Sequence, residues 1–333
     1  MSETAAGTGG AATDDGRAEW FAARFEALSE QVGQVIRGKR EVIELSLVCL
    51  FAEGHLLIED VPGVGKTSLA RAIATSIDAS FHRIQFTPDL LPTDVTGVTV
   101  YRQESGQFVF HKGPVFANVV VADEINRASP KTQSALLEVM EERQVTVDSV
   151  SYPVGRPFLV IATQNPIELE GTYRLPEAQI DRFLMRVSVG YPNLAAEAEI
   201  VTMSEGGSPL SGLSPVMNLD EVRAMLEAVE AVHVHPTLVT YMAQLAAATR
   251  TLAELRLGVS PRGTVALMRA ARARAASAGR AWVIPEDVKV VLPAVFGHRM
   301  LLSPEAELRS VTGDEILERV LGQVPVPRTT AVA

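Results

Sequence analysis

The stretch His55–Ala74, HLLIEDVPGVGKTSLARAIA, decides the fold, because it reads as an apolar strand, a loop with two glycines and a helix. A phosphate-binding loop usually has the pattern G-x-x-x-x-G-K-[ST]. Counting back from the G-K-T triplet at residues 65–67 places Asp60 where that pattern has its first glycine. Asp60 ends the strand and precedes the loop proper, so it affects the turn into the loop more than the anion pocket.

The loop keeps the groups on which phosphate binding depends. Gly63 and Gly65 let the backbone turn tightly, so that N–H groups point at an anion at the N-terminus of the helix. Lys66 adds a positive charge for the β- and γ-phosphates, and Thr67 adds a hydroxyl for Mg²⁺. A chance G-K-T turn is the alternative, and the flanking strand and helix argue against it. The predicted nucleotide-binding residues of the loop are Pro62, Gly63, Val64, Gly65, Lys66, Thr67 and Ser68.

Composition and charge limit the possible classes of protein. The 333 residues suffice for two domains, and 47% hydrophobic with 21% charged residues is typical of a globular protein. The net charge of -10 argues against a general nucleic-acid-binding surface. The longest apolar run, LSLVCLFA, is too short to cross a bilayer, so we expect no membrane insertion. The single cysteine, Cys49, is expected in the core and fits a reducing cytoplasm.

Strand-like and helical segments alternate between residues 55 and 189. The runs HLLIED, FHRIQF, NVVVADE, FLVIATQNP and FLMRVSV predict an α/β fold with a five-stranded parallel sheet that helices cover on both faces. After a Gly-, Ser- and Pro-rich loop over 206–215, the chain reads as helix. We therefore expect a disordered tail over 1–16, a nucleotide-binding core over 17–192, and a helical lid domain with a short C-terminal tail over 193–333.

Two inserts in this core have the alternating pattern of β-hairpins. VTVYRQESGQFVFHKGPV (98–115) predicts a hairpin with its turn at 104–106. RQVTVDSVSYPVGRPF (143–158) predicts a second hairpin before the next strand.

Polar residues follow two of the predicted strands. Asp123 and Glu124 end the run NVVVADE, where Asp123 would hold the water shell of Mg²⁺ and Glu124 would polarise an attacking water. An acidic pair on a solvated strand end is the alternative. Asn165 ends FLVIATQN, and ligands gather at the carboxyl ends of parallel strands, so it could contact that water or the γ-phosphate. Alone, Asn165 would read as a turn residue before proline.

Longer phrases of the sequence resemble the AAA+ ATPases, and among them the MoxR family. They are LIEDVPGVGKT, RIQFTPDLLPTDVTG, ADEINRASPKTQSALLEVMEERQVTVD, IATQNPIELEGTYRLPEAQIDRF and GVSPRG, in the order of that family. A residue other than glycine at the position of Asp60 is common there, so Asp60 reads as a family variant. Arg174 departs from the family, whose members usually carry proline, and we leave it out of the site.

The resemblance implies roles for further residues. Asn165 corresponds to sensor 1. Arg182 matches the arginine finger, which reaches the nucleotide of the neighbouring subunit, and Arg262 matches sensor 2, which the lid carries toward the γ-phosphate. Surface ion pairs are the alternative for both arginines. Ile36 and Gly38 match the segment that frames adenine in this clan. The first hairpin lies where helix-2-insert members carry one toward the pore of the ring.

The resemblance also implies an activity and partners. We expect a cytoplasmic, Mg²⁺-dependent ATPase that forms a ring of identical subunits, a hexamer, and remodels client proteins together with a von Willebrand factor A domain protein. Alternatives are the AAA+ subunit of a metal chelatase and a slow ATP-gated scaffold. A DNA motor fits the acidic charge poorly, and a transcription activator would carry G-A-F-T-G-A at the first insert, which this sequence lacks.

Overall fold

The computed structural model describes residues 14–165, 172–204 and 209–327. Helix α1 (Asp14–Gly33) begins inside the tail predicted over 1–16, so the prediction of a disordered tail is wrong for the last three of these residues. The rest of that predicted tail, 1–13, lies outside the described residues, as do residues 205–208, which include the start of the predicted loop, and 328–333 at the C-terminus.

The central sheet confirms the predicted α/β fold. Its five strands have the order β2-β5-β8-β1-β9, and all neighbouring strands run parallel. The phosphate-loop strand β1 therefore lies between β8 and β9. The strands are β1 (Leu56–Glu59), β2 (Phe81–Gln85), β5 (Val119–Asp123), β8 (Leu159–Gln164) and β9 (Met185–Val187).

The central strands β1, β5 and β8 are buried on both faces of the sheet: successive side chains of a strand point to opposite faces, and nearly all side chains of these strands are buried. On β5, Val121 joins one hydrophobic cluster while Val120 and Ala122 join the other. The first cluster includes apolar residues of α1, α2 (Arg40–Phe51) and α3 (Lys66–Ser76). The second includes α5 (Pro130–Glu142), which covers the opposite face. This double cover explains why the strands read as nearly unbroken apolar runs.

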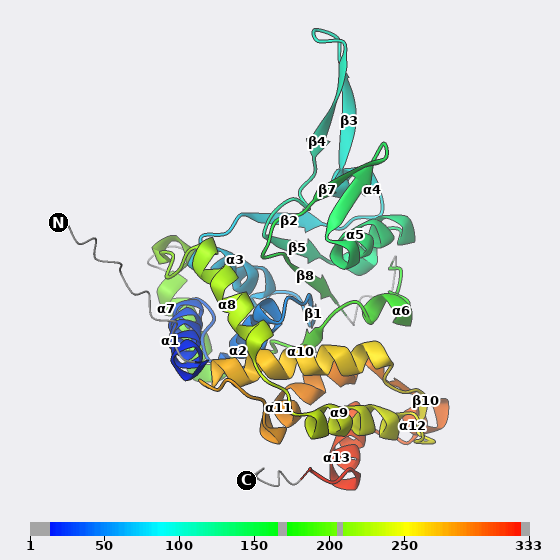
Figure 1. Cartoon of the computed structure of the whole chain (residues 1–333). Coiled ribbons are helices and arrows are strands. Elements are labelled where there is room, and N and C mark those ends of the chain that lie inside the picture. Colours follow the sequence, from blue (N-terminus) through cyan, green and yellow to red (C-terminus); the bar gives the residue numbers. More distant parts are fainter. Residues whose placement is uncertain (1–13, 166–171, 205–208, 328–333) are drawn as a thin grey trace, which may run out of the picture.

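Both predicted hairpins are present. Strands β3 (Gly97–Arg102) and β4 (Gln107–Lys112) form an antiparallel pair that projects well beyond the sheet (Figure 1). Gly106 closes the turn with a φ of 66°, which favours glycine, and its N–H donates to the carbonyl of Arg102. Strands β6 (Gln144–Val147) and β7 (Val150–Pro153) form the second hairpin. Short helices α4 (Pro92–Thr96) and η1 (Ile125–Arg127) flank this region.

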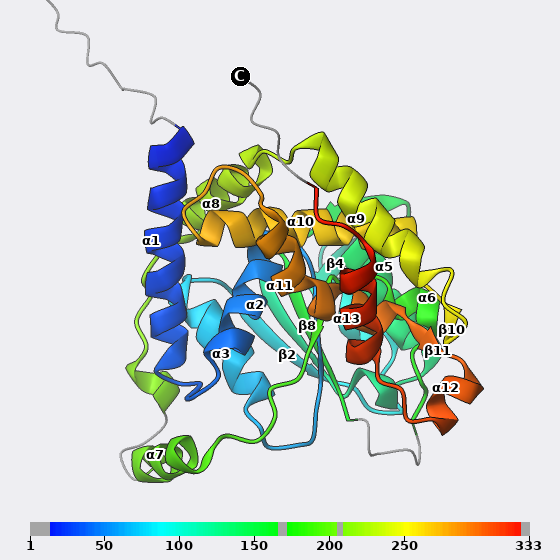
Figure 2. The same cartoon turned by 90° about the horizontal axis from the view of Figure 1, so that it is seen from below.

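The C-terminal part of the described chain is mainly helical, as predicted, and most of it lies beneath the sheet in Figure 1 and in front of it in Figure 2. One hydrophobic cluster runs from the sheet into the C-terminal helices, so the domain boundary at 192 stays a prediction. None of the described helices is both long and apolar enough to cross a membrane. The remaining elements are α6 (Glu177–Ile180), α7 (Leu194–Ser204), η2 (Pro209–Gly212), α8 (Leu219–Ala231), α9 (Pro236–Thr249), β10 (Leu255–Leu257), α10 (Pro261–Ser277), α11 (Pro285–Phe296), η3 (Gly297–Arg299), β11 (Leu301–Leu302), α12 (Pro304–Leu308) and α13 (Gly313–Gln323).

Candidate nucleotide site

The phosphate loop joins β1 to α3 at the carboxyl end of the sheet. Gly63 and Gly65 have φ angles of 86° and 91°, a region that residues with a Cβ rarely enter. Gly65 caps α3, so the first N–H groups of that helix face the loop. Lys66 Nζ donates to the backbone carbonyl of Asp60 at 2.7 Å, which folds the lysine back over the loop.

Asp60 replaces the usual glycine with a buried structural carboxylate. Its Oδ2 accepts from the N–H of Gly190 at 2.5 Å and from the hydroxyl of Ser188 at 2.9 Å. Its Oδ1 accepts from the N–H of Val61 at 2.8 Å. Burial alone would raise the pKa of Asp60, but these donors outweigh it and hold that pKa below its ordinary value. Asp60 therefore ties the start of the loop to the chain that leaves β9.

Asp123 and Glu124 lie beside the phosphate loop, at the end of β5. The hydroxyl of Thr163, on β8, donates to Asp123 Oδ1 at 2.6 Å and accepts from the N–H of Glu124 at 2.9 Å. Glu124 has a left-handed φ of 55°, which is uncommon outside glycine and turns the chain sharply after the strand. Asn165 directly follows β8 and is buried at the same edge of the sheet. Residues 166–171 lie outside the described chain.

Three residues that sequence reasoning did not place in the site contact the two acids. Arg83 donates to Asp123 Oδ2 through Nε at 3.0 Å and Nη2 at 2.6 Å. Gln85 Nε2 donates to Glu124 Oε2 at 2.9 Å, and Arg127 Nη1 donates to the same oxygen at 3.0 Å. The available signal was the strand FHRIQF, in which Arg83 and Gln85 are two apart and so share one face.

The phosphate loop, the two acids, Arg83 and Asn165 line one cleft of about 380 Å³. The described residues hold no cluster of three or more His, Cys, Asp or Glu that would suit a metal cage. A carboxylate and a hydroxyl fit Mg²⁺, which keeps several waters and takes its other ligands from phosphates. The cleft is lined by Pro62, Gly63, Gly65, Lys66, Thr67, Ser68, Arg83, Asp123, Glu124 and Asn165.

The segment predicted to frame adenine lies next to the loop. A Cβ on Gly65 would meet Cδ1 of Ile36 at 3.6 Å, so that buried side chain lies against the loop. Gly38 has a φ of 69°, and a Cβ there would lie 3.2 Å from that of Ala196. Val64 is half-buried and packs on the same hydrophobic cluster as Ile36.

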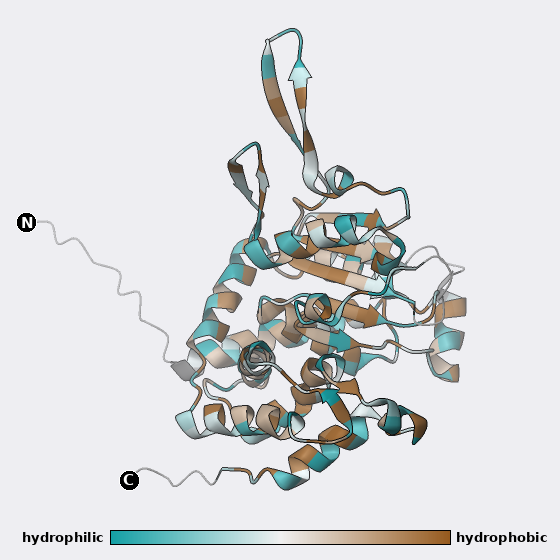
Figure 3. Ribbon diagram, turned by 90° about the vertical axis from the view of Figure 1, so that its right-hand side faces the viewer, coloured by the Kyte–Doolittle hydropathy of each residue, from teal (hydrophilic) through white to brown (hydrophobic). Residues whose placement is uncertain are grey.

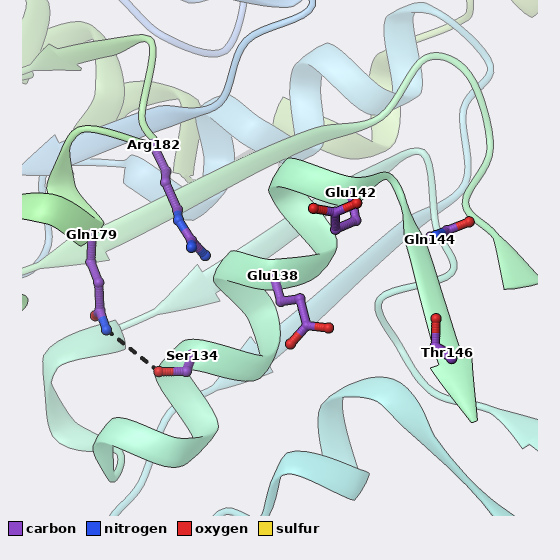
Figure 4. A pocket seen from close by; sticks show the side chains of 7 residues that line it. All are labelled: Ser134, Glu138, Glu142, Gln144, Thr146, Gln179 and Arg182. Carbon is purple, nitrogen blue, oxygen red and sulfur yellow. Dashed lines mark hydrogen bonds between the residues drawn. The ribbon is translucent and has the colours of Figure 1, made fainter. Parts of the chain in front are cut away.

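The two predicted phosphate-sensing arginines lie together, away from that cleft. Arg182 Nε is 3.0 Å from Glu141 Oε2, and Arg262 Nη2 is 3.2 Å from Glu141 Oε1. One carboxylate of α5 thus bridges an arginine of the core and an arginine of the lid, and both line a pocket of about 520 Å³. Arg182 also lines a neighbouring pocket of about 460 Å³, where it lies along α5 near Glu138 (Figure 4). Neither arginine lines the nucleotide cleft.

A buried arginine fixes the chain on both sides of Arg182. Arg299, only 7% exposed, donates through Nε to Asp181 Oδ1 at 2.7 Å and through Nη2 to the carbonyl of Phe183 at 2.6 Å. Burial lowers the pKa of Arg299, while the charge of Asp181 opposes that change. Ser260, which caps α10, donates to Asp181 Oδ2 at 3.1 Å. This cluster holds Arg182 and the start of α10, with Arg262, in fixed positions.

Comparisons with known proteins agree with this geometry. Residues 55–185 match the model of the ATPase family associated with various cellular activities (AAA), and residues 247–320 match that of the AAA lid domain. The chain is 38% identical to a protein from Cytophaga hutchinsonii provisionally described as an ATPase, whose solved structure superposes with a TM-score of 0.87 over 94% of this chain and 97% of that one.

Relatives with names resemble the chain over nearly their full length. It is 41% identical to "Chaperone MoxR1" of Mycobacterium tuberculosis, over 95% of this chain and 87% of that protein. It is 32% identical to "Protein MoxR" of Methylorubrum extorquens, over 92% and 95%. It is 47% identical to the uncharacterized protein YeaC of Bacillus subtilis, over 90% and 93%. With a five-stranded core, a helical lid and similarity along nearly the whole chain, the protein is an ATPase that belongs to the MoxR family of AAA+ proteins.

Proposed function

We propose that each ATP site is divided between two subunits of a ring. One subunit supplies the phosphate loop, Asp123, Glu124 and Asn165, and its neighbour supplies Arg182 and Arg262. The observation that carries this proposal is the shared contact of both arginines with Glu141, outside the cleft that the phosphate loop lines. ATP bound in that cleft therefore has neither arginine from its own subunit, and a head-to-tail contact would bring both.

In this proposal Glu124 accepts a proton from the attacking water, which Asn165 orients. Lys66 and the N–H groups of the loop balance the charge of the β- and γ-phosphates. Mg²⁺ held by Thr67 and, through water, Asp123 supplies further positive charge to the same phosphates. Arg182 and Arg262 of the neighbour neutralise charge that develops on the transferred phosphoryl group.

Mixing two inactive variants tests the divided site. Glu124→Gln lacks the base, and Arg182→Ala lacks an arginine, so each alone should be nearly inactive. In a 1:1 mixture that exchanges subunits, about a quarter of the interfaces pair an intact Glu124 with an intact Arg182, because the contact is directional. Partial recovery of ATP hydrolysis is therefore expected. The same recovery is expected when Arg262→Ala replaces Arg182→Ala.

Wild-type protein diluted with each variant is the control, because it measures how well a ring tolerates inactive neighbours. Fluorescence energy transfer between labelled subunits checks that they exchange. If exchange and tolerance are both demonstrated and the mixture stays inactive, the arginines do not act across the interface.

We further propose that this cytoplasmic ATPase works as a hexamer and remodels client proteins with a von Willebrand factor A domain partner. The name of the relative MoxR1 supports a chaperone role. The projecting hairpin β3–β4 also supports it, because the side chains of Val100, Tyr101 and Phe108 are exposed on it. The ribbon of this hairpin includes segments in the brown of hydrophobic residues in Figure 3. Native mass spectrometry tests the hexamer.

Affinity capture tests the client proposal. Glu124→Gln with ATP should retain clients, and the same variant with Tyr101→Ser and Phe108→Ser should retain fewer. Equal capture by both would contradict a client-binding role of the hairpin. Absence of a von Willebrand factor A domain protein among the captured proteins would contradict the proposed partner.

A further inference from the structure

Arg83 occupies an oxygen of the carboxylate that the proposed function assigns to the metal. Its guanidinium donates twice to Asp123 Oδ2, at 3.0 and 2.6 Å. The other oxygen, Oδ1, accepts from the hydroxyl of Thr163 at 2.6 Å. Both carboxylate oxygens of Asp123 therefore have hydrogen-bond partners, and the partner of Oδ2 is the positively charged guanidinium of Arg83. Arg83 also lines the nucleotide cleft together with Lys66 and Thr67.

The same guanidinium is connected to the proposed catalytic base. Arg83 Nη2 donates to Gln85 Oε1 at 2.8 Å, so the amide oxygen of Gln85 faces the arginine. The amide nitrogen then faces the other way and donates to Glu124 Oε2 at 2.9 Å. An unbroken chain of hydrogen bonds thus joins Asp123 to Glu124 through Arg83 and Gln85.

The exposure of the two partners distinguishes this ion pair from a structural one. The side chain of Arg83 is 50% exposed while that of Asp123 is 12% exposed, so the guanidinium can move into solvent and the carboxylate cannot. In the pair Arg280–Asp287 the side chains are 21% and 3% exposed, so neither of them is as exposed as the side chain of Arg83. A buried carboxylate requires a compensating cation, and in this structure Arg83 provides it.

We propose that Arg83 is a positioning residue that takes the place of the metal on Asp123 in the nucleotide-free subunit and, through Gln85, holds Glu124. Arg83 leaves Asp123 when Mg²⁺ and ATP bind. Gln85 then loses its hydrogen bond to Arg83 and holds Glu124 less firmly in its resting position. Arg83 thereby links the arrival of the metal to the release of the base. The inference rests on the proposed role of Asp123 as the metal-binding carboxylate.

The test measures how strongly Mg²⁺ tightens nucleotide binding. The dissociation constant of a fluorescent, slowly hydrolysed ATP analogue is measured in EDTA and in excess Mg²⁺, and the ratio of the two constants gives the coupling between metal and nucleotide. Arg83→Gln removes the competing cation. Arg71→Gln, at an exposed position of α3, removes the same charge without touching Asp123 and is the matched control. Arg83→Lys keeps a cation within reach of Asp123.

The coupling ratio of Arg83→Gln should be roughly 3- to 10-fold higher than that of Arg71→Gln. This range corresponds to the free energy of a partly exposed ion pair, which Mg²⁺ no longer has to break in the variant. Arg83→Lys should stay closer to wild type. An unchanged ratio would mean that Arg83 only joins two strands, and a lower ratio would mean that it helps to hold the metal-bound nucleotide; either result overturns the inference. Failure of the wild-type protein to bind the analogue at all would instead overturn the proposed function.

Discussion

At the scale of single residues, Asp60 shows how a loop can lose a pattern residue and keep its shape. Glycine would make the backbone flexible at this position, whereas the carboxylate of Asp60 accepts three hydrogen bonds that hold the start of the loop in place. Because their donors lie on Val61 and on the chain after β9, the carboxylate fixes the loop relative to the edge of the sheet. The sequence showed that the glycine is missing, but not which groups compensate for it.

Asp60→Gly, which creates the usual loop pattern, should therefore weaken the fold. The variant loses three hydrogen bonds to a charged group, and we expect the free energy of unfolding in urea to fall by about 2 kcal/mol. Asp78→Gly is the matched control, because Asp78 is exposed and has a φ of 50°, which suits glycine. A smaller loss for Asp60→Gly than for Asp78→Gly would contradict the structural role of Asp60.

A second residue-scale prediction concerns His55, which precedes β1. Its Nδ1 accepts from the N–H of Val160 at 3.0 Å, so its Nε2 carries the hydrogen shared with the carbonyl of Met140. Burial is the main cause that lowers the pKa of His55 from 6.5 to about 3. The folded protein keeps this ring neutral, whereas the unfolded chain binds a proton below pH 6.5. Stability is therefore lost as the pH falls from 6.5 toward 3, by up to about 1.4 kcal/mol per pH unit.

His55→Gln should reduce this acid sensitivity, since glutamine can accept from Val160 and donate to Met140 without taking up a proton. Urea unfolding between pH 4 and 7 measures the slope of stability against pH. His82→Gln, at an exposed position on β2, is the control. Equal slopes in the two variants would show that His55 does not cause the effect.

At the scale of elements, the cluster around Asp181 joins the end of α6 to the start of α10 and to η3. Asp181 balances the charge of the buried Arg299 and accepts from Ser260, the N-cap of α10. One carboxylate thus sets the position of the chain just after α6, which carries Arg182, relative to the start of α10, which carries Arg262. Serine followed by proline at Ser260 and Pro261 is typical of a helix N-terminus, but Arg299 lies far along the chain from it and no local pattern connects the two.

Asp181→Asn should destabilise the protein, because it leaves the charge of Arg299 buried with weaker compensation. Removing one partner of such a pair lowers the free energy of unfolding by about 3 kcal/mol. Asp220→Asn, which breaks the exposed contact with Arg223, should lower it by less than about 0.5 kcal/mol. Thermal and urea unfolding compare the two, and similar losses would show that the Asp181 pair is no more important than a surface one.

At the scale of the whole molecule, the cleft with the phosphate loop and the pocket with the two arginines are separate in one subunit. If neighbouring subunits complete the site, the rate of hydrolysis per subunit should fall when wild-type protein is diluted below the concentration at which rings dissociate. Size-exclusion chromatography with light scattering measures that dissociation alongside the rate. A constant rate across the dissociation range would contradict a divided site.

Adding back an inactive subunit sharpens this prediction. An excess of Glu124→Gln over dilute wild type should restore the rate per wild-type subunit, because Glu124→Gln still supplies Arg182 and Arg262. The double variant Glu124→Gln with Arg182→Ala should restore much less. Equal restoration by the two would show that assembly alone, and not the arginine, raises the rate.

The sequence by itself determined the parts of this protein whose physics is local. Strands and helices follow from the period of apolar residues, and the phosphate loop, Asp123 and Glu124 are each marked by a few adjacent positions. The turn at Gly106 and the cap at Ser260 follow from residue types within one turn of chain. These features could be predicted, because side chains within a few residues of one another have only a few possible arrangements.

Only the tertiary structure decided which distant charges meet. Arg83 reaches Asp123 because β2 and β5 are neighbours in a parallel sheet, and Glu141 meets Arg182 and Arg262 because α5 and the start of α10 come together beside the chain before β9. Arginine side chains are long and their partners lie 40 or more residues away, so many pairings are compatible with the same sequence pattern. Packing of the sheet and the lid around a shared core selects one of them, because a buried charge is stable only where a partner of opposite charge lies within reach.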